Sequence, residues 1–243
     1  MCFHSSQTKK VQELESRYNV KLSEKVNRPY FDVPQFHING FSHPNMLVIP
    51  QEKKSVLFPG IWGIAPKNVH PDSLDNYYKE AIKFGGGLNA QSEKLFKHFL
   101  YKESIFTRRC IIPVTGFFEP HEFEKQKYPV YVSPKDESTF SLAGIYSIVG
   151  KKVTFSVLTK EASPLFSKIH NTKKRQPVLL SKATEKKWLD ENQSKNDILE
   201  MIKMPYSEKN VSYFTVNRDL FHPKIDSNEP YILEKVDYGV TFK

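Results

Sequence analysis

The pattern of hydrophobic and polar positions predicts a chain built mainly from strands. Between residues 153 and 157, apolar Val and Phe alternate with Thr and Ser, which is the period-two pattern of a half-buried strand. Between residues 31 and 59, four prolines interrupt an otherwise apolar stretch and predict short, irregular strands. Compact runs of β-branched, aromatic and aliphatic residues predict the remaining strands at residues 109–114, 128–132, 140–148, 177–180 and 213–216.

Fewer segments predict helices. Residues 7–18 form a short polar helix in this interpretation, and Ser181 opens a helix that is followed by a second one at 198–202. After a turn at the triple glycine of residues 85–87, four apolar side chains between residues 95 and 100 have helical spacing. We therefore expect one α+β domain over residues 1–243, with a curved antiparallel or mixed, barrel-like sheet and peripheral helices.

Composition narrows the class of protein. Hydrophobic residues make up 39% and charged residues 26% of the chain, which excludes wholesale disorder. Lys and Arg outnumber Asp and Glu by 36 to 27, giving a formal charge of +9. Such a charge attracts polyanions, of which nucleic acid is the commonest, but a merely basic protein explains it equally well.

The chain has two cysteines, Cys2 and Cys110, and their separation matches no metal-ligand spacing. Cys110 belongs to an apolar run and is expected to be a small buried residue. The absence of a disulfide framework, of an apolar leader and of a membrane-length stretch predicts an intracellular, cytoplasmic protein. We expect neither a metal nor an organic cofactor.

Cys2 carries the most distinctive candidate chemistry. Removal of Met1 would leave a thiol and an α-amine on adjacent carbons. An α-amine with a pKa of ~7.7–8.0 is partly neutral near pH 7, and an unperturbed thiol with a pKa of about 8.5 is partly ionised. The amine can form an imine with an aldehyde, and the thiol can close that imine to a thiazolidine. A cysteine at position two can also be accidental, so this feature does not decide alone.

Three further segments hold candidate residues, each with an ordinary structural explanation. The segment 88–93 opens the helix predicted after the glycine turn, where Asn89 would be a good N-cap. Glu119 follows the strand and turn at 109–116 and is one of several acids in a predicted loop. His170 precedes a strand and is one of eight histidines, most of which would be structural or solvated.

In this order, the segments resemble the SOS-response-associated peptidase (SRAP) family. Its members begin Met-Cys and carry an Asn-Ala-Arg-Ala-Glu-type motif, then Arg-Arg-Cys-Leu-Ile-Pro-x-x-Gly-Phe-Tyr-Glu-Trp, then Ile-His-x-Arg-Met-Pro-Val-Ile-Leu. The chain has similar segments at 89–93, 108–119 and 169–180. Residues 62–66, 140–146 and 155–159 also resemble family strands, so the likeness covers most of the chain.

The resemblance implies a β-rich monomer that binds single-stranded DNA in a basic cleft and traps abasic sites as a thiazolidine. It also implies an autopeptidase activity that exposes the cysteine, and work near the nucleoid in a bacterium. At the matched positions, Cys2 supplies both nucleophiles and Asn89 orients the amine or imine. Glu119 shuttles protons, and His170 acts as acid or base on the sugar oxygen.

The sequence departs from the family at positions expected to hold DNA. Phe3 and His4 replace Gly-Arg, Gln91 replaces an arginine, Pro120 replaces a tryptophan, and three residues are inserted before Arg175. Nearby cations could compensate, although each also fits an ordinary solvated surface; Trp62 could stack on a base or lie in the core. The expected DNA contacts are His4, Trp62, Lys67, Gln91, Arg108, Arg109, Lys173, Lys174 and Arg175.

Three hypotheses follow, in order of preference. The first is covalent capture of abasic sites through Cys2, with a peptidase or lyase side activity. The second is a cysteine-dependent peptidase or amidase that uses the same four residues without DNA crosslinking. The third is a non-catalytic binder of single-stranded DNA, for which charge is sufficient and Cys2 is irrelevant.

Overall fold

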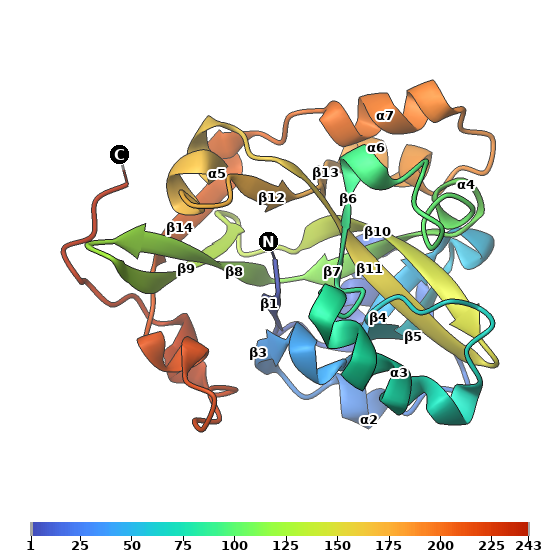
Figure 1. Ribbon diagram of the computed structural model, residues 1–243, viewed down its shortest axis with the longest axis horizontal. Coiled ribbons are helices and arrows are strands. Elements are labelled where there is room, and N and C mark those ends of the chain that lie inside the picture. The colour runs from blue at the N-terminus through green and yellow to red at the C-terminus, as the bar shows by residue number, and fades with distance from the viewer. Residues whose placement is uncertain (1, 243) are drawn as a thin grey trace.

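Two sheets form the centre of the computed structural model, which describes residues 2–242 (Figure 1). The first sheet has the strand order β14-β9-β8-β1-β3. Its strands are β1 (His4–Gln7), β3 (Gln35–Asn39), β8 (Gly116–Phe123), β9 (Gln126–Pro134) and β14 (Val211–Thr215). All of its pairings are antiparallel, and β1 lies between β8 and β3 near the middle of the molecule.

The second sheet closes on itself. Its order is β12-β11-β10-β7-β4-β5-β2, with β13 beside β10 and β6 beside β11. Its strands are β2 (Lys21–Leu22), β4 (Asn45–Pro50), β5 (Val56–Trp62), β6 (Asn89–Gln91), β7 (Arg109–Val114), β10 (Phe140–Val149), β11 (Lys152–Glu161), β12 (Arg175–Pro177) and β13 (Leu179–Leu180). Because β5 also pairs with β11 in parallel, the path β11-β10-β7-β4-β5 forms a ring. The predicted α+β fold with a mixed, barrel-like sheet is confirmed.

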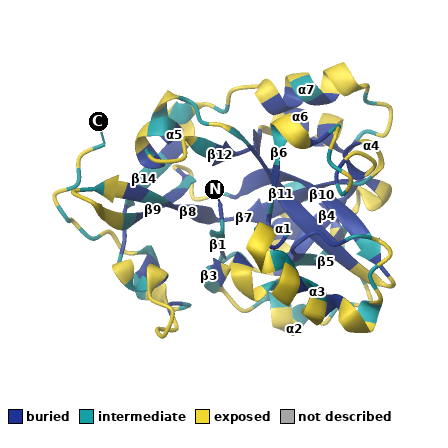
Figure 2. Cartoon of the chain, viewed as in Figure 1, coloured by how far each residue is buried: buried dark blue, intermediate teal, exposed yellow. Residues whose placement is uncertain are grey.

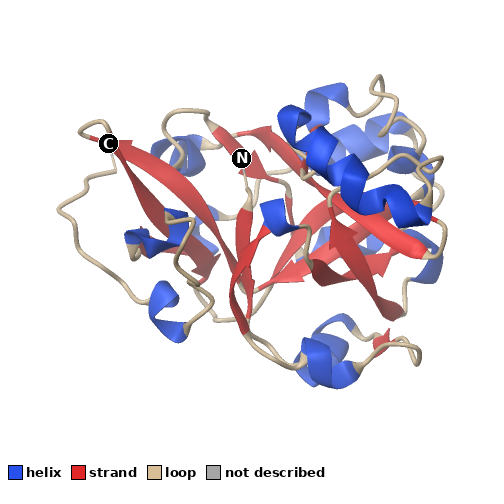
Figure 3. Ribbon diagram, turned by 60° about the horizontal axis from the view of Figure 1, so that its bottom comes forward, coloured by secondary structure: helices blue, strands red, loops and turns tan. Residues whose placement is uncertain are grey.

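Helices lie around the sheets (Figure 3). They are α1 (Val11–Tyr18), α2 (Arg28–Phe31), α3 (Leu74–Ala81), α4 (Ser104–Thr107), α5 (Pro164–Ile169), α6 (Lys182–Trp188) and α7 (Lys195–Lys203). The strands are largely buried, whereas the outer faces of the helices are exposed (Figure 2). Across residues 2–242, no helix has the length and apolar character needed to span a bilayer.

Alternation along the strands divides the interior into two apolar clusters. On β7, Cys110 and Ile112 belong to the cluster that also contains Cys2, whereas Ile111 belongs to a second cluster with Trp188 of α6. Successive side chains of a strand point to opposite faces, so one strand serves both clusters. Burial of Cys110 is as predicted.

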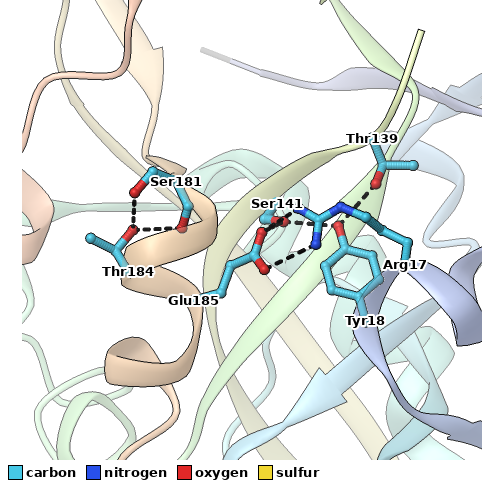
Figure 4. A network of polar contacts seen from close by, with 7 residues as sticks. All are labelled: Arg17, Tyr18, Thr139, Ser141, Ser181, Thr184 and Glu185. Carbon is cyan, nitrogen blue, oxygen red and sulfur yellow. Dashed lines mark hydrogen bonds and ion pairs between the residues drawn. The ribbon is translucent and has the colours of Figure 1, made fainter. Parts of the chain in front are cut away.

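A largely buried ion pair attaches α1 to α6 (Figure 4). The guanidinium of Arg17 donates to both carboxylate oxygens of Glu185, at 2.6 and 3.1 Å. Ser141 of β10 donates to the same carboxylate at 2.7 Å, and the hydroxyl of Tyr18 lies 2.8 Å from that serine. The carboxylate is thereby satisfied from both the helix and the sheet, which a buried charge requires.

One predicted helix and one predicted loop are wrong. Residues 89–91 form β6 instead of opening a helix, because their backbone pairs in parallel with β11. The apolar residues at 95–100 follow the 3₁₀-helix Ser92–Lys94 in successive turns; Leu95 is buried but Phe99 is 69% exposed, so they do not share one face. Glu119 lies in β8, not in a loop.

Candidate active site

Cys2 lies just ahead of β1 and is fully buried. Its thiol points to the backbone oxygen of His4, 3.8 Å from Sγ. Burial raises the pKa of the Cys2 thiol well above its ordinary value, and the negative charge of Glu119 raises that pKa further. The thiol is therefore protonated near neutral pH, which corrects the expectation of partial ionisation. Met1, whose removal would free the amine, lies outside the described residues.

Asn89 holds the backbone of Cys2. It begins β6, where it pairs with Val157 of β11, and its Nδ2 donates to the carbonyl oxygen of Cys2 at 2.9 Å. The other amide atom, Oδ1, is buried and has no hydrogen-bond partner within residues 2–242. A buried acceptor without a donor is costly, so this oxygen is suited to receive an N–H or O–H from a bound group.

Glu119 and His170 form a buried pair beside Cys2. Nδ1 of His170 lies 2.9 Å from Oε2 of Glu119, and the side chains are 3% and 0% exposed. Glu119 comes from β8, and His170 is the residue that ends α5. A proton on Nδ1 donates to the carboxylate and leaves Nε2 as the second proton-transfer position of the ring.

The structure thus brings together all four residues predicted to carry the chemistry. Asn89 is hydrogen-bonded to Cys2, the charge of Glu119 acts on the Cys2 thiol, and Glu119 contacts His170. They come from three separate segments and the chain terminus. No group of three or more His, Cys, Asp or Glu side chains between residues 2 and 242 is arranged to hold a metal ion.

A cleft of about 1070 Å³ reaches His170. Phe3, His4 and Pro120 also border it, together with residues of the β8–β9 hairpin and of the 3₁₀-helix Arg218–Phe221. Its cations are Lys125, Lys127, Lys173 and Arg218. Apart from Lys173, sequence reasoning missed these residues, because they belong to no motif and are assembled only by folding.

A smaller hollow of about 180 Å³ shares Phe3 with the cleft. Asn89, Gln91 and Lys94 line it, together with His98 and Tyr101. Phe3 therefore borders two depressions, each of which reaches one of the four residues predicted to carry the chemistry. In the family pattern this position is a glycine, which would leave the two depressions more open to each other.

Two of the predicted DNA contacts require correction because the side chains are buried. Trp62 is 1% exposed and its indole N–H donates to the Leu88 carbonyl, so it belongs to the core. Arg109 is fully buried, and its guanidinium donates to backbone carbonyls of residues 105, 106, 188 and 190. Neither side chain is available to DNA.

The other predicted contacts are distributed unevenly. His4 and Lys173 line the cleft and Gln91 lines the smaller hollow. Lys174 is exposed, next to Arg175, whose guanidinium pairs with both carboxylate oxygens of Glu93. Two more cations have acidic partners elsewhere: Lys67 pairs with Glu103, and Arg108 with Glu52.

His4 is neutral where the family has a cation. Its Nδ1 lies 2.9 Å from Nε2 of His37, whose Nδ1 lies 2.6 Å from the hydroxyl of Ser227. Burial lowers the pKa of His4 to about 3, with a further contribution from His37, and burial lowers the pKa of His37 to about 4. The positive charge of the cleft therefore comes from its lysines and Arg218, and His4 adds none.

Comparison with known proteins adds three findings. The model of the SOS response associated peptidase (SRAP) family matches residues 1–223. The abasic site processing protein YoqW of Bacillus subtilis is 26% identical over 219 residues, which is 84% of this chain and 92% of the relative. A crystal structure of a protein from Bacteroides thetaiotaomicron superposes with a TM-score of 0.83 at 29% identity, covering 97% of this chain and 100% of the other.

Proposed function

The chain belongs to the SOS response associated peptidase family, and on that premise we propose that it processes abasic sites in single-stranded DNA by covalent capture through Cys2, acting as a monomer. Curated relatives named abasic site processing proteins support the substrate. The observation that carries the proposal is the convergence of Cys2, Asn89, Glu119 and His170 beside a cleft lined by cations.

The reaction is a condensation that releases one water. Once Met1 is removed, the α-amine of Cys2 attacks the C1′ aldehyde of the ring-opened sugar, and a proton passes from nitrogen to oxygen to give a carbinolamine. Loss of that hydroxyl as water gives the imine. Sγ then bonds to the imine carbon, and the thiol proton ends on the nitrogen, which closes the thiazolidine.

The buried thiol sets the order of these steps. Because burial and Glu119 keep the Cys2 thiol protonated, the amine is the first nucleophile. Ring closure then needs a group that takes the thiol proton and returns one to nitrogen. The Glu119–His170 pair, with its 2.9 Å contact, is suited to both transfers. The Oδ1 atom of Asn89 can accept a hydrogen bond from the amine or the carbinolamine hydroxyl.

The cleft provides the DNA-binding surface in this proposal. Lys127, Lys173 and Arg218 line it and would neutralise DNA phosphates. His4, on the side of the catalytic group, is neutral and cannot do so. The DNA backbone would therefore pass along these cations, with the lesion turned toward His170.

Intact-mass spectrometry tests the proposal. The protein, confirmed to begin at Cys2, is incubated with single-stranded DNA that carries one abasic site. We expect a covalent adduct that is lost in Cys2→Ser and retained in Cys110→Ser, the matched control at the other buried cysteine. An adduct that persists in Cys2→Ser would refute the assignment. Salt-dependent binding without any adduct would instead favour a non-catalytic DNA binder.

An associated autopeptidase activity is supported by the same geometry. Glu119 and His170 beside a buried cysteine are suited to activate its thiol toward a preceding peptide bond. A precursor extended at its N-terminus should release the extension, and Glu119→Gln should prevent release. Release in the absence of any DNA adduct would favour a peptidase without a crosslinking role.

A further inference from the structure

We propose that His121 and Asn171 are positioning residues that hold His170 against Glu119, and that the C-terminal segment supports them through Phe242. We call the contacts made by His121 and Asn171 the clamp. The clamp deepens the proposed function, and the test by reaction rate rests on that function. Its starting point is a buried histidine that the proposed chemistry leaves without a role.

His121 binds the backbone immediately before His170. It is 2% exposed, and its Nδ1 lies 2.9 Å from the carbonyl oxygen of Lys168 and 3.0 Å from that of Ile169. Carbonyls cannot donate, so Nδ1 carries the proton and donates to both. These are carbonyls of the last turn of α5, which have no partner within the helix.

Asn171 binds the backbone immediately after His170 to the same strand. Its Oδ1 accepts from the N–H of Glu122 at 2.9 Å, and its Nδ2 donates to the carbonyl of Glu122 at 2.8 Å. The side-chain amide thus satisfies both backbone groups of one strand residue. His170 is therefore fixed on either side along the chain by contacts to two successive residues of β8.

Strand geometry explains why one strand can do this. Residues two apart on a strand point to the same face, so Glu119 and His121 both face α5 while Pro120 between them borders the cleft. Glu119 contacts the His170 ring, and His121 contacts the backbone that carries this ring. The His170 ring and the backbone that carries it are therefore both held by the same strand, β8.

The C-terminal segment covers the clamp. The ring of Phe242 lies 4.7 Å from that of His121 in an edge-on arrangement, and Tyr213 of β14 contacts Phe242 at 5.3 Å. Two hydrogen bonds between Thr215 and Val236 attach the segment to β14. Phe242 lies beyond residue 223, where the match to the family model ends.

The first test separates positioning from DNA binding. His121→Leu removes the donor, whereas His121→Asn keeps an N–H near the position of Nδ1. At saturating abasic DNA, we expect His121→Leu to lower the adduct-forming rate about 10- to 100-fold, as a misplaced catalytic group does, with an unchanged half-saturating DNA concentration. His121→Asn should recover most of the rate, and Phe242→Ala should cause a smaller loss than His121→Leu.

Gln51→Leu is the matched control. Gln51 is also buried and also bridges two backbone groups, the N–H of Arg109 and the carbonyl of Phe106, so its loss reports the general cost of such a bridge. It should leave the rate unchanged. An unchanged rate in His121→Leu, or equal losses in the leucine and asparagine variants, would overturn the proposal.

A second measurement does not depend on crosslinking. Side-chain ¹⁵N chemical shifts report the tautomer and hydrogen bonding of the His170 ring, and we expect them to change in His121→Leu but not in Gln51→Leu. If the wild-type protein formed no adduct, the proposed function would fail. The chemical shifts would still show whether His121 positions the His170 ring. Identical His170 shifts in wild type and His121→Leu would refute this positioning role.

Discussion

Nδ1 of His170 lies 2.9 Å from Oε2 of Glu119, and both side chains are almost completely buried. The contact joins β8 to the end of α5 and puts a negative charge next to the Cys2 thiol. Removal of one member of a buried pair leaves the other without its partner. Substitutions at this pair, in the cleft and in the core are expected to change the reaction rate, DNA binding and stability, respectively.

Glu119→Gln should have opposite effects on the thiol and on the reaction. Loss of the carboxylate charge removes one cause of the raised Cys2 pKa, so that pKa should fall. The adduct-forming rate should nevertheless fall about 100-fold, because the group that accepts protons is gone. Thiolate absorbance in a Cys110→Ser background and single-turnover crosslinking measure the two quantities. A rate that rose as the pKa fell would contradict a proton-transfer role.

Lys127→Gln and Arg218→Gln should each weaken binding to single-stranded DNA. Both side chains line the cleft. The slope of log K against log salt is negative, and each lost phosphate contact should make it less steep by roughly 0.7. Fluorescence anisotropy at several salt concentrations measures this slope. Lys67→Gln is the control, since Lys67 is exposed and pairs with Glu103 outside the cleft. Equal effects of all three substitutions would indicate that only net charge matters.

His4→Arg should strengthen DNA binding. The histidine is neutral, so the substitution adds a charge to a wall of the cleft that has none at this position. We expect tighter binding and a slope of log K against log salt that is steeper by roughly 0.7, measured on the same DNA. Unchanged binding would mean that the DNA backbone does not pass this wall.

Mild acid should destabilise the fold through His4 and His37. Their pKa values are about 3 and about 4 in the folded chain, against 6.5 when unperturbed. Between pH 6.5 and 4 the unfolded chain binds protons that the folded chain does not, so the free energy of unfolding falls as pH falls. The loss by pH 5 should be roughly 1–2 kcal/mol per histidine. Thermal unfolding at pH 7 and 5 measures it, and His4→Gln/His37→Gln should show a flatter dependence.

Arg109→Leu should affect stability and leave the intrinsic affinity of folded protein for DNA unchanged. The buried guanidinium satisfies four backbone carbonyls, and burial lowers its pKa to about 10. Loss of these charge-assisted bonds should cost about 3 kcal/mol or more in the free energy of unfolding. Urea unfolding measures the loss of stability, and DNA titration measures the affinity of the folded variant. Weaker DNA binding by fully folded variant would restore Arg109 as a contact.

The sequence predicted the parts of the fold that depend on local pattern. The strands at 109–114, 140–149 and 152–161 follow directly from apolar runs and alternation. The parallel pairing of residues 89–91 with β11 could not be predicted, because a three-residue strand has little pattern of its own and depends on its partner. The helix α5 was also missed, since Pro164 and a six-residue length give a weak signal.

The candidate site likewise has residues that the sequence pointed to and residues that only the fold brings together. Cys2, Asn89, Glu119 and His170 could be proposed from the sequence because each stands in a motif whose order along the chain is informative. The cations Lys127 and Arg218 stand in no motif, and the fold alone brings them to the same cleft. Arg109 is the converse case, because a basic residue in a motif proved to be a buried structural element.

The position of β1 has a mechanical consequence. The strand is paired on both sides, with Phe117 and Phe118 of β8 and with Ile38 and Asn39 of β3. A pulling force applied at residue 2 along the axis of β1 would therefore load both ladders in shear, and rupture would require both to yield together. The edge strand β14, by contrast, is held by β9 alone. A cargo attached at residue 2 would therefore be tethered through a strand with two paired neighbours, whereas one attached through β14 would be tethered through a strand with one.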